Sequence, residues 1–195
     1  MSDTTNVSVP RHRGGWLGEW LAAWNAFWFT PADPLPLALI RIIAGALFTW
    51  ASIVWLLDAD AFFGNDGWQR PENVWRMNDQ PWQWSWYFAA GTPGMARMLA
   101  GITLVAAVML TLGIATPLAA VVAFAGLVSS VNRAPLNTFG LDDTLGMLLF
   151  AVMVGPAGAV LSVDRLLAPD ASADRPSVRA NLAIRLIQVQ LCVVY

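Results

Sequence analysis

The sequence has 195 residues, of which 57% are hydrophobic and only 12% are charged. Soluble globular domains carry about 25% charged residues, so this composition argues against a soluble protein and fits about five membrane spans of roughly 20 residues. The formal net charge of −2 gives no reason to expect a nucleic-acid partner, and a single cysteine (Cys192) with a single histidine (His12) provides no set of Cys or His ligands for a metal.

The first 29 residues divide into two parts. Residues 1–15 are polar, lack the apolar core of a signal peptide and are expected to form a disordered tail. Residues 16–29 repeat tryptophan at every fourth position, which places the indoles on one face of a helix. Because Trp prefers the headgroup region, we expect this amphipathic helix to lie on the membrane surface. The alternative is a helix that packs on the bundle through the same face.

Five apolar segments follow the helix-breaking residues 30–36. They are expected to span the membrane at about 37–57, 95–112, 117–131, 144–160 and 182–195. Their long apolar runs lack the period-two alternation of barrel strands, so the predicted fold is an all-α polytopic transmembrane helical bundle. At 1.5 Å per residue the third segment reaches only about 22 Å, less than the hydrocarbon core of about 30 Å.

Arginine placement predicts the orientation of the chain. With the N-terminus in the cytoplasm, the inner arginines outnumber the outer ones, which favours this orientation. The inner set is Arg11, Arg13, Arg165, Arg175, Arg179 and Arg185, and the outer set is Arg70, Arg76, Arg97 and Arg133. Residues 58–94 then form an outer loop whose many tryptophans indicate contact with the bilayer. The absence of lysine beside abundant Ala, Gly, Pro and Trp favours a GC-rich bacterial source, hence a multi-pass protein of the cell (inner) membrane.

The connector at residues 132–143 is the best candidate for a polar site. It gathers amide, guanidinium and carboxylate groups beside a short span, where polar groups need partners. The candidate residues are Asn132, Arg133, Asn137, Asp142 and Asp143. Two ordinary roles remain open: the carboxylates can cap the following helix, and Arg133 can extend to a lipid headgroup.

Two charged residues outside this connector are also candidates for a functional or structural role. Arg41 is the only ionisable residue well inside a predicted span, which makes it a candidate functional residue. Its alternative role is extension of the side chain to the cytoplasmic interface. Asp164 is expected to cap or anchor a short interfacial helix. The sequence contains no P-loop, dinucleotide fingerprint, nucleophile elbow or zinc motif.

Six segments, in this order, resemble the HTTM family, the transmembrane domain shared with vitamin K-dependent gamma-carboxylases. They are FTPADPLPLALIRIIAGALF (29–48), DAFFGNDGW (60–68), LTLGIATPLAA (110–120), NRAPLNTFGLDDTLGMLLF (132–150), GPAGAVLSVDRLL (155–167) and IRLIQVQLCVVY (184–195). The resemblance implies a multi-span helical bundle with a cytoplasmic N-terminus.

The resemblance also implies an activity. The family's best-known member carboxylates glutamate side chains and couples this to oxidation of reduced vitamin K. Its catalytic lysine lies just after a segment like residues 184–195, whereas this sequence ends there and contains no lysine. We therefore expect a C-terminally incomplete domain without carboxylase activity of its own, acting with a quinol or another lipid-soluble substrate, or with a peptide. The alternative is a non-catalytic membrane component in peptide or lipid export or maturation.

Overall fold

The computed structural model describes residues 15–77, 83–168 and 175–194. Within these ranges the regular elements are helices, and the one strand-like feature is an isolated bridge between Ala32 and Ser177. Three helices are long and apolar enough to cross a membrane, namely α2 (Leu35–Leu57), α5 (Pro93–Leu112) and α6 (Thr116–Arg133). The predicted class, an all-helical membrane protein, is therefore confirmed.

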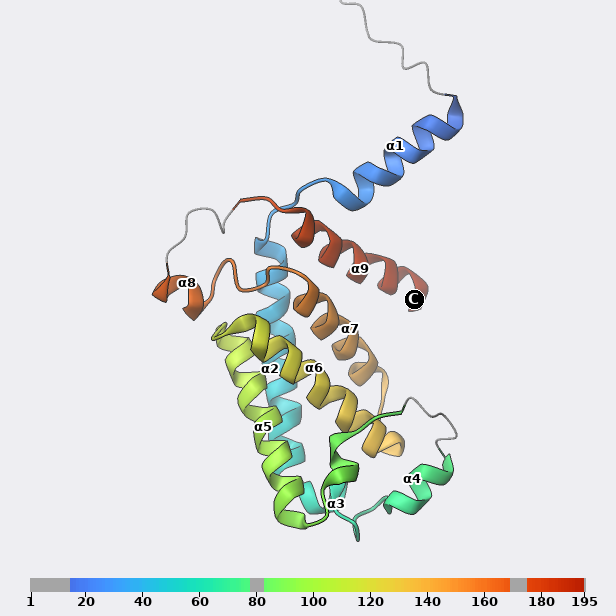
Figure 1. Ribbon diagram of the computed structural model, residues 1–195, viewed down its shortest axis with the longest axis vertical. Helices are drawn as coiled ribbons and strands as arrows, with labels where there is room; N and C mark the ends of the chain where they lie inside the picture. The colour runs from blue at the N-terminus through green and yellow to red at the C-terminus, as the bar shows by residue number, and fades with distance from the viewer. Residues whose placement is uncertain (1–14, 78–82, 169–174, 195) are drawn as a thin grey trace, which may run out of the picture.

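Shorter helices complete the described part of the chain (Figure 1). They are α1 (Trp16–Phe29), α3 (Ala59–Phe63), α4 (Pro71–Met77), the 3-10 turns η1 (Trp86–Ala89) and η2 (Pro135–Asn137), α7 (Gly140–Val154), α8 (Val163–Leu167) and α9 (Val178–Val194). The predicted disordered tail lies outside the described residues except for Gly15, as do residues 78–82 of the long loop between α2 and α5.

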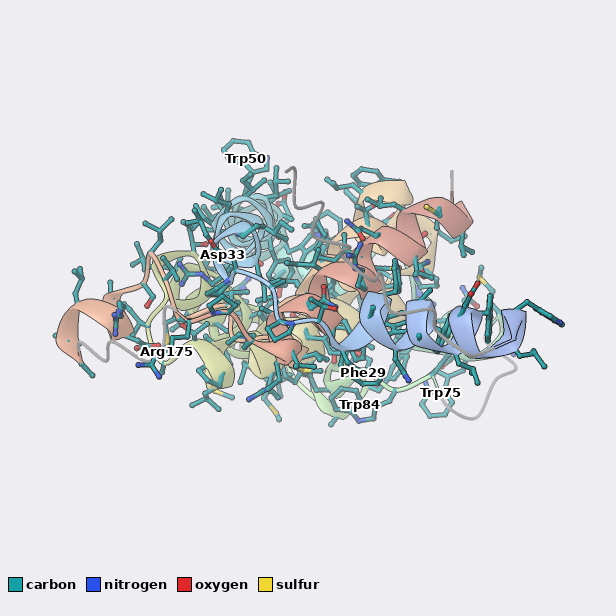
Figure 2. The ribbon with its side chains drawn as sticks, turned by 90° about the horizontal axis from the view of Figure 1, so that it is seen from above. Phe29, Asp33, Trp50, Trp75, Trp84 and Arg175 are labelled. Carbon is teal, nitrogen blue, oxygen red and sulfur yellow. The ribbon has the colours of Figure 1, made fainter. Side chains whose placement is uncertain are left out.

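Helix α2 separates a core face from a lipid face. Pro36 stands in its first turn, where the missing amide hydrogen costs no helical hydrogen bond. Leu37 and Phe48 are completely buried, whereas Ile43 and Trp50 on the other side are exposed. Figure 2 shows Trp50 pointing away from the bundle, and its side chain is 71% exposed. Apolar side chains on the outside of a membrane-spanning helix contact lipid, so this face is the bilayer face.

Helices α5 and α6 form a tight hairpin built on small residues. Gly113 ends α5 in the left-handed conformation, with φ of 73°. A Cβ atom added to Gly126 would lie 2.7 Å from Thr103 Cγ2, so the two helices approach each other here only because residue 126 has no side chain. Ala119 and Ala123, the small residues that the sequence offers as a contact face, are both buried.

Helix α6 extends beyond the span expected at residues 117–131. It continues to Arg133, and its 18 residues reach about 27 Å at 1.5 Å each. The polar side chains of its last turns have hydrogen-bond partners on the backbone; for example, Ser130 Oγ donates to the Gly126 carbonyl oxygen at 2.9 Å. The expected bounds of the third span are therefore corrected, whereas its length stays below the hydrocarbon core of about 30 Å.

Helix α7 is displaced toward the N-terminus relative to the span expected at residues 144–160. It begins at Gly140 and ends at Val154, because Gly155 is extended (φ −92°, ψ 168°) and precedes a proline. The expected connector at 132–143 is thereby shortened from both sides. The carboxylates that were expected to precede this helix stand in its first turn.

Helices α2, α5, α6 and α7 run beside one another through the centre of the molecule (Figure 1). Their buried leucines and alanines form the main core, with Leu110, Leu127, Leu145 and Leu149 among its largest members. Helix α1 lies at the top of Figure 1 and α8 lies beside the upper end of these four helices, whereas α3 and α4 lie at their lower end. At that lower end a second small core forms, where the rings of Phe63 and Tyr87 stack with centroids 4.0 Å apart.

Candidate functional site

Arg133 is fully buried and binds the backbone of the loop between α3 and α4. Its Nη1 donates to the Gln69 carbonyl oxygen at 2.7 Å, and its Nη2 donates to the Gly64 carbonyl oxygen at 2.8 Å. The side chain is 0% exposed. Extension to a lipid headgroup, one of the two roles left open by the sequence, is therefore wrong for Arg133. Two carbonyl groups of an irregular loop need donors at this depth, and the guanidinium provides both.

Asn132 also holds a loop in place. Its Nδ2 donates to the Trp84 carbonyl oxygen at 2.7 Å. Beside it, Ser85 Oγ donates to the Ser129 carbonyl oxygen at 2.7 Å and accepts the amide of Tyr87 at 3.2 Å. The last turns of α6 therefore bind the segment before α5 through backbone and side-chain hydrogen bonds.

Asp142 caps α7. Its carboxylate accepts the Phe139 amide hydrogen at 3.0 Å, and the Asp142 amide donates to the Phe139 carbonyl oxygen at 2.8 Å. This reciprocal arrangement satisfies groups that a helix start leaves free. It is the capping role that the sequence left open for the two carboxylates, and it applies to Asp142.

Asp143 and Asn137 remain exposed at the surface. Asp143 lines two cavities, one of about 340 Å³ between α6 and α7 and one of about 440 Å³ between α7 and α9. Asn132 and Asp142 share the first of these with Asp143. The structure therefore brings three of the five connector residues to one cavity, while Arg133 faces the α3–α4 loop and Asn137 stands apart on η2.

The cavity between α7 and α9 combines an apolar wall with a few polar groups. Its apolar lining residues are Met147, Leu148, Ile187, Leu191 and Val194, and its polar ones are Asp143, Thr144 and Gln190. Sequence reasoning did not single out Thr144 or Gln190. The available signal was the presence of glutamine in an otherwise apolar last segment, since a polar side chain in a membrane-facing helix needs a partner.

Arg41 is buried where α2, the α5–α6 turn and the segment before α8 meet. Its side chain is 0% exposed, and its Nη2 donates to the Leu161 carbonyl oxygen at 2.5 Å. The guanidinium therefore reaches the end of the bundle that carries the α5–α6 turn, where protein atoms and not lipid headgroups cover it. Arg41 Nη1 occupies the space that a side chain at position 113 would need: a Cβ atom added to Gly113 would lie 1.8 Å from this nitrogen. The turn thus needs glycine for its positive φ and for this close contact.

Asp164 binds the start of α6 beside Arg41. Its carboxylate accepts the amides of Ala115 and Thr116 at 2.7 and 2.8 Å, and Thr116 Oγ1 donates to it at 2.9 Å. Burial alone would raise the pKa of Asp164, but these hydrogen bonds and the Arg41 charge outweigh it and hold the pKa below its usual value. Ala115 and Leu161 both have positive φ, at 44° and 52°, so the junction also contains backbone strain.

Among the described residues there is no group of three or more His, Cys, Asp or Glu side chains placed to hold a metal ion. The arrangement contains two structural junctions, at Arg133 and at Arg41 with Asp164, and one amphipathic cavity between α7 and α9. No family model, no curated protein and no solved structure matches the chain.

Proposed function

We propose that this chain is a multi-pass membrane protein of the HTTM type that binds a lipid-dissolved ligand of the quinol class between α7 and α9. The cavity of about 440 Å³ there is the observation that carries the proposal. A quinol has an apolar ring or tail and hydroxyl donors, and the cavity offers an apolar wall with the Asp143 carboxylate, Thr144 and Gln190 as polar groups. The ordered sequence segments that resemble the family support the same choice.

The proposed topology has five spans with a cytoplasmic N-terminus. Helices α7 and α9 supply the fourth and fifth spans; at 15 and 17 residues they are shorter than a typical span but pack on the three long helices or on each other. The positions of the connections support this. The segments that the topology places outside, α3 and α4, lie at one end of the bundle in Figure 1, and α8 lies toward the other.

Helix α1 is proposed to lie on the membrane surface. None of its residues is buried, and its described contacts to the bundle come from its C-terminal end. Asn181 Nδ2 donates to the Phe27 and Trp28 carbonyl oxygens at 2.8 Å each, and the Arg185 guanidinium lies 4.3 Å from the Phe27 ring centroid. Trp20 and Trp24 stay exposed, so shallow lipid quenchers should quench their fluorescence and deep ones should not.

In this proposal the chain binds and orients the ligand, and a group outside the 195 residues supplies the strong base that carboxylase-like chemistry requires. Arginine cannot act as that base because its guanidinium stays protonated in proteins. Asp143 can accept a hydrogen bond from a quinol hydroxyl, and Thr144 can donate to or accept from the same ring substituents. The sequence contains no lysine for the remaining role.

A second candidate function, a non-catalytic component in peptide or lipid export or maturation, is favoured by a separate observation. Three of the candidate polar residues, Asn132, Arg133 and Asp142, use their side chains to bind the protein's own backbone. Residues engaged in this way hold loops and helix ends rather than a substrate. This candidate becomes the better one if the cavity does not bind a quinol.

The decisive experiment is retention of a radiolabelled naphthoquinol by the chain in lipid nanodiscs under anaerobic conditions. Saturable retention by the native chain is expected, with binding about tenfold weaker in Asp143→Ala, which removes a charged hydrogen-bond acceptor. Asp66→Ala removes an exposed carboxylate of the α3–α4 loop, away from the cavity, and is the matched control. The proposal fails if the native chain shows no saturable retention or if both variants bind equally.

A further inference from the structure

A separate cavity of about 370 Å³ lies at the other end of the bundle, beside α4. Its lining residues are Trp68, Gln69, Asn73, Val74, Arg76, Met77 and Leu136. They come from the α3–α4 loop, from α4 and from η2, which directly follows the end of α6. None of these residues belongs to the cavity between α7 and α9, so the two sites are independent.

The cavity lies at the level where α6 leaves the membrane. Arg133, the last residue of α6, donates to the Gln69 carbonyl oxygen, and the Leu136 amide donates to Gln69 Oε1 at 3.4 Å. These contacts fix the cavity to the end of a membrane-spanning helix. Figure 1 shows α4 beside that end of α6. Headgroups and the first part of the acyl chains occupy this level of a bilayer.

The polar groups in the cavity suit an anion. Arg76 is exposed and forms no ion pair within the described part of the chain, although Glu72 stands one turn before it on α4. Asn73 adds an amide one turn of helix from the same position. Gln69 is 6% exposed, and its Nε2 is a buried donor without an acceptor among the described residues. An arginine with amide donors is a common arrangement for binding phosphate.

The remaining lining residues suit the apolar part of the same molecule. Trp68 and Leu136 are among the most exposed large hydrophobic residues at this end, and Met77 is exposed beside them. A free phosphate ion would leave these side chains uncovered. A choline or ethanolamine headgroup would bring an ammonium group to a cavity that has Arg76 as its cation and no carboxylate among its described lining residues.

We propose that this cavity binds the headgroup of an anionic glycerophospholipid. Arg76 and Asn73 contact the phosphate, and the side chains of Trp68, Met77 and Leu136 cover the glycerol and the first carbons of the acyl chains. The occupant is a membrane lipid because the site is fixed to the end of a membrane-spanning helix and has both a cation and an exposed apolar wall.

The test is native mass spectrometry of the full chain released from nanodiscs that contain equal amounts of phosphatidylglycerol and phosphatidylcholine. Preferential retention of phosphatidylglycerol is expected, and Arg76→Gln should reduce it about fivefold, the effect of one surface arginine on anionic-lipid binding. Asn73→Ala, at an exposed helix position, should reduce it about twofold, the smaller effect of one hydrogen bond. Arg97→Gln is the matched control, since Arg97 is also an arginine at this end but pairs with Asp60.

Three results would overturn the proposal. Equal retention of the two lipids would show that the cavity does not select an anion. Unchanged phosphatidylglycerol retention in both Arg76→Gln and Asn73→Ala, or an equal loss in Arg97→Gln, would place the bound lipid elsewhere. Displacement of the lipid by millimolar inorganic phosphate without detergent would identify a phosphate site instead. None of these results bears on quinol binding between α7 and α9.

Discussion

The bundle buries an arginine near each of its ends, and the two are held in different ways. Arg133 donates to two backbone carbonyl oxygens of the α3–α4 loop and has no carboxylate partner in the described part of the chain. Arg41 donates to one carbonyl oxygen, that of Leu161, and is attracted by the Asp164 carboxylate, which is itself bound to the start of α6. Both side chains are 0% exposed.

Arg133 and Arg41 thus hold the loops at the two ends of the bundle in different ways. At the Arg133 end the side chain is the described donor to the Gln69 carbonyl oxygen and shares the Gly64 carbonyl oxygen with the Gly67 amide, so the loop is bound to α6 through this one side chain. At the Arg41 end most of the junction's hydrogen bonds are accepted by the Asp164 carboxylate, from the amides of Ala115 and Thr116 and from Thr116 Oγ1. We therefore expect the fold to depend more on Arg133 than on Arg41.

The largest effect is expected for Arg133→Met. The Gln69 carbonyl oxygen loses its donor and the Gly64 carbonyl oxygen keeps only the Gly67 amide at 3.2 Å, so the free energy of unfolding should fall by about 3 kcal/mol, since each unsatisfied buried group costs about 1–3 kcal/mol. Denaturant unfolding of the purified protein in detergent measures this. Arg97→Gln, which breaks an exposed ion pair with Asp60, should change stability by less than about 1 kcal/mol. Equal losses in the two variants would contradict the structural role of Arg133.

An intermediate effect is expected for Asp164→Ala, which removes the hydrogen bonds at the start of α6 and should cost about 2 kcal/mol. Because folding lowers the pKa of Asp164, its contribution is complete above the unfolded-state pKa of about 3.9 and is lost as the pH falls through the lower folded value. Stability measured from pH 7 down to pH 3 should therefore converge for the native chain and the variant. A constant difference over this whole range and below it would refute the role of the ionised carboxylate.

The smallest of the three effects is expected for Arg41→Met. It removes one charge-assisted hydrogen bond and keeps most of the side-chain volume, so the loss should be about 1.5 kcal/mol. The same unfolding measurement applies. A double variant with Asp164→Ala should lose less than the sum of the two single losses, because the charges attract each other. A larger loss for Arg41→Met than for Arg133→Met would reverse the comparison.

The positions of the membrane spans could be predicted from the sequence where the apolar runs are long. The first two spans were expected at 37–57 and 95–112, and α2 and α5 occupy Leu35–Leu57 and Pro93–Leu112. The end of α6 was placed too early because hydropathy treats Asn132 and Arg133 as the start of a polar connector. In the structure both side chains donate to carbonyl oxygens of neighbouring loops, and a hydropathy pattern does not record such bonds.

The candidate site was harder to predict than the fold. The sequence marks polar residues in an apolar setting, and Asn132, Asp142 and Asp143 do line one cavity. The sequence does not tell whether the side chain of such a residue donates to a backbone carbonyl group elsewhere in the protein, because the acceptors lie in loops distant in sequence. These acceptors are Gly64 and Gln69 for Arg133, and Leu161 for Arg41. The cavity between α7 and α9 depends on how two separate helices pack, so the sequence marks Gln190 as a polar residue in an apolar segment but does not tell that it shares a cavity with Thr144.

The proposed topology is tested most directly by cysteine accessibility in intact cells, with Cys192→Ser as the background. Single substitutions Trp75→Cys, Ala115→Cys and Thr138→Cys place reporters on α4, on the α5–α6 turn and after η2. With this topology, a membrane-impermeant thiol reagent should label the variants at positions 75 and 138 in intact cells. The variant at position 115 should react only after the cells are permeabilised. Labelling of position 115 from outside, or protection of positions 75 and 138, would contradict the proposed topology.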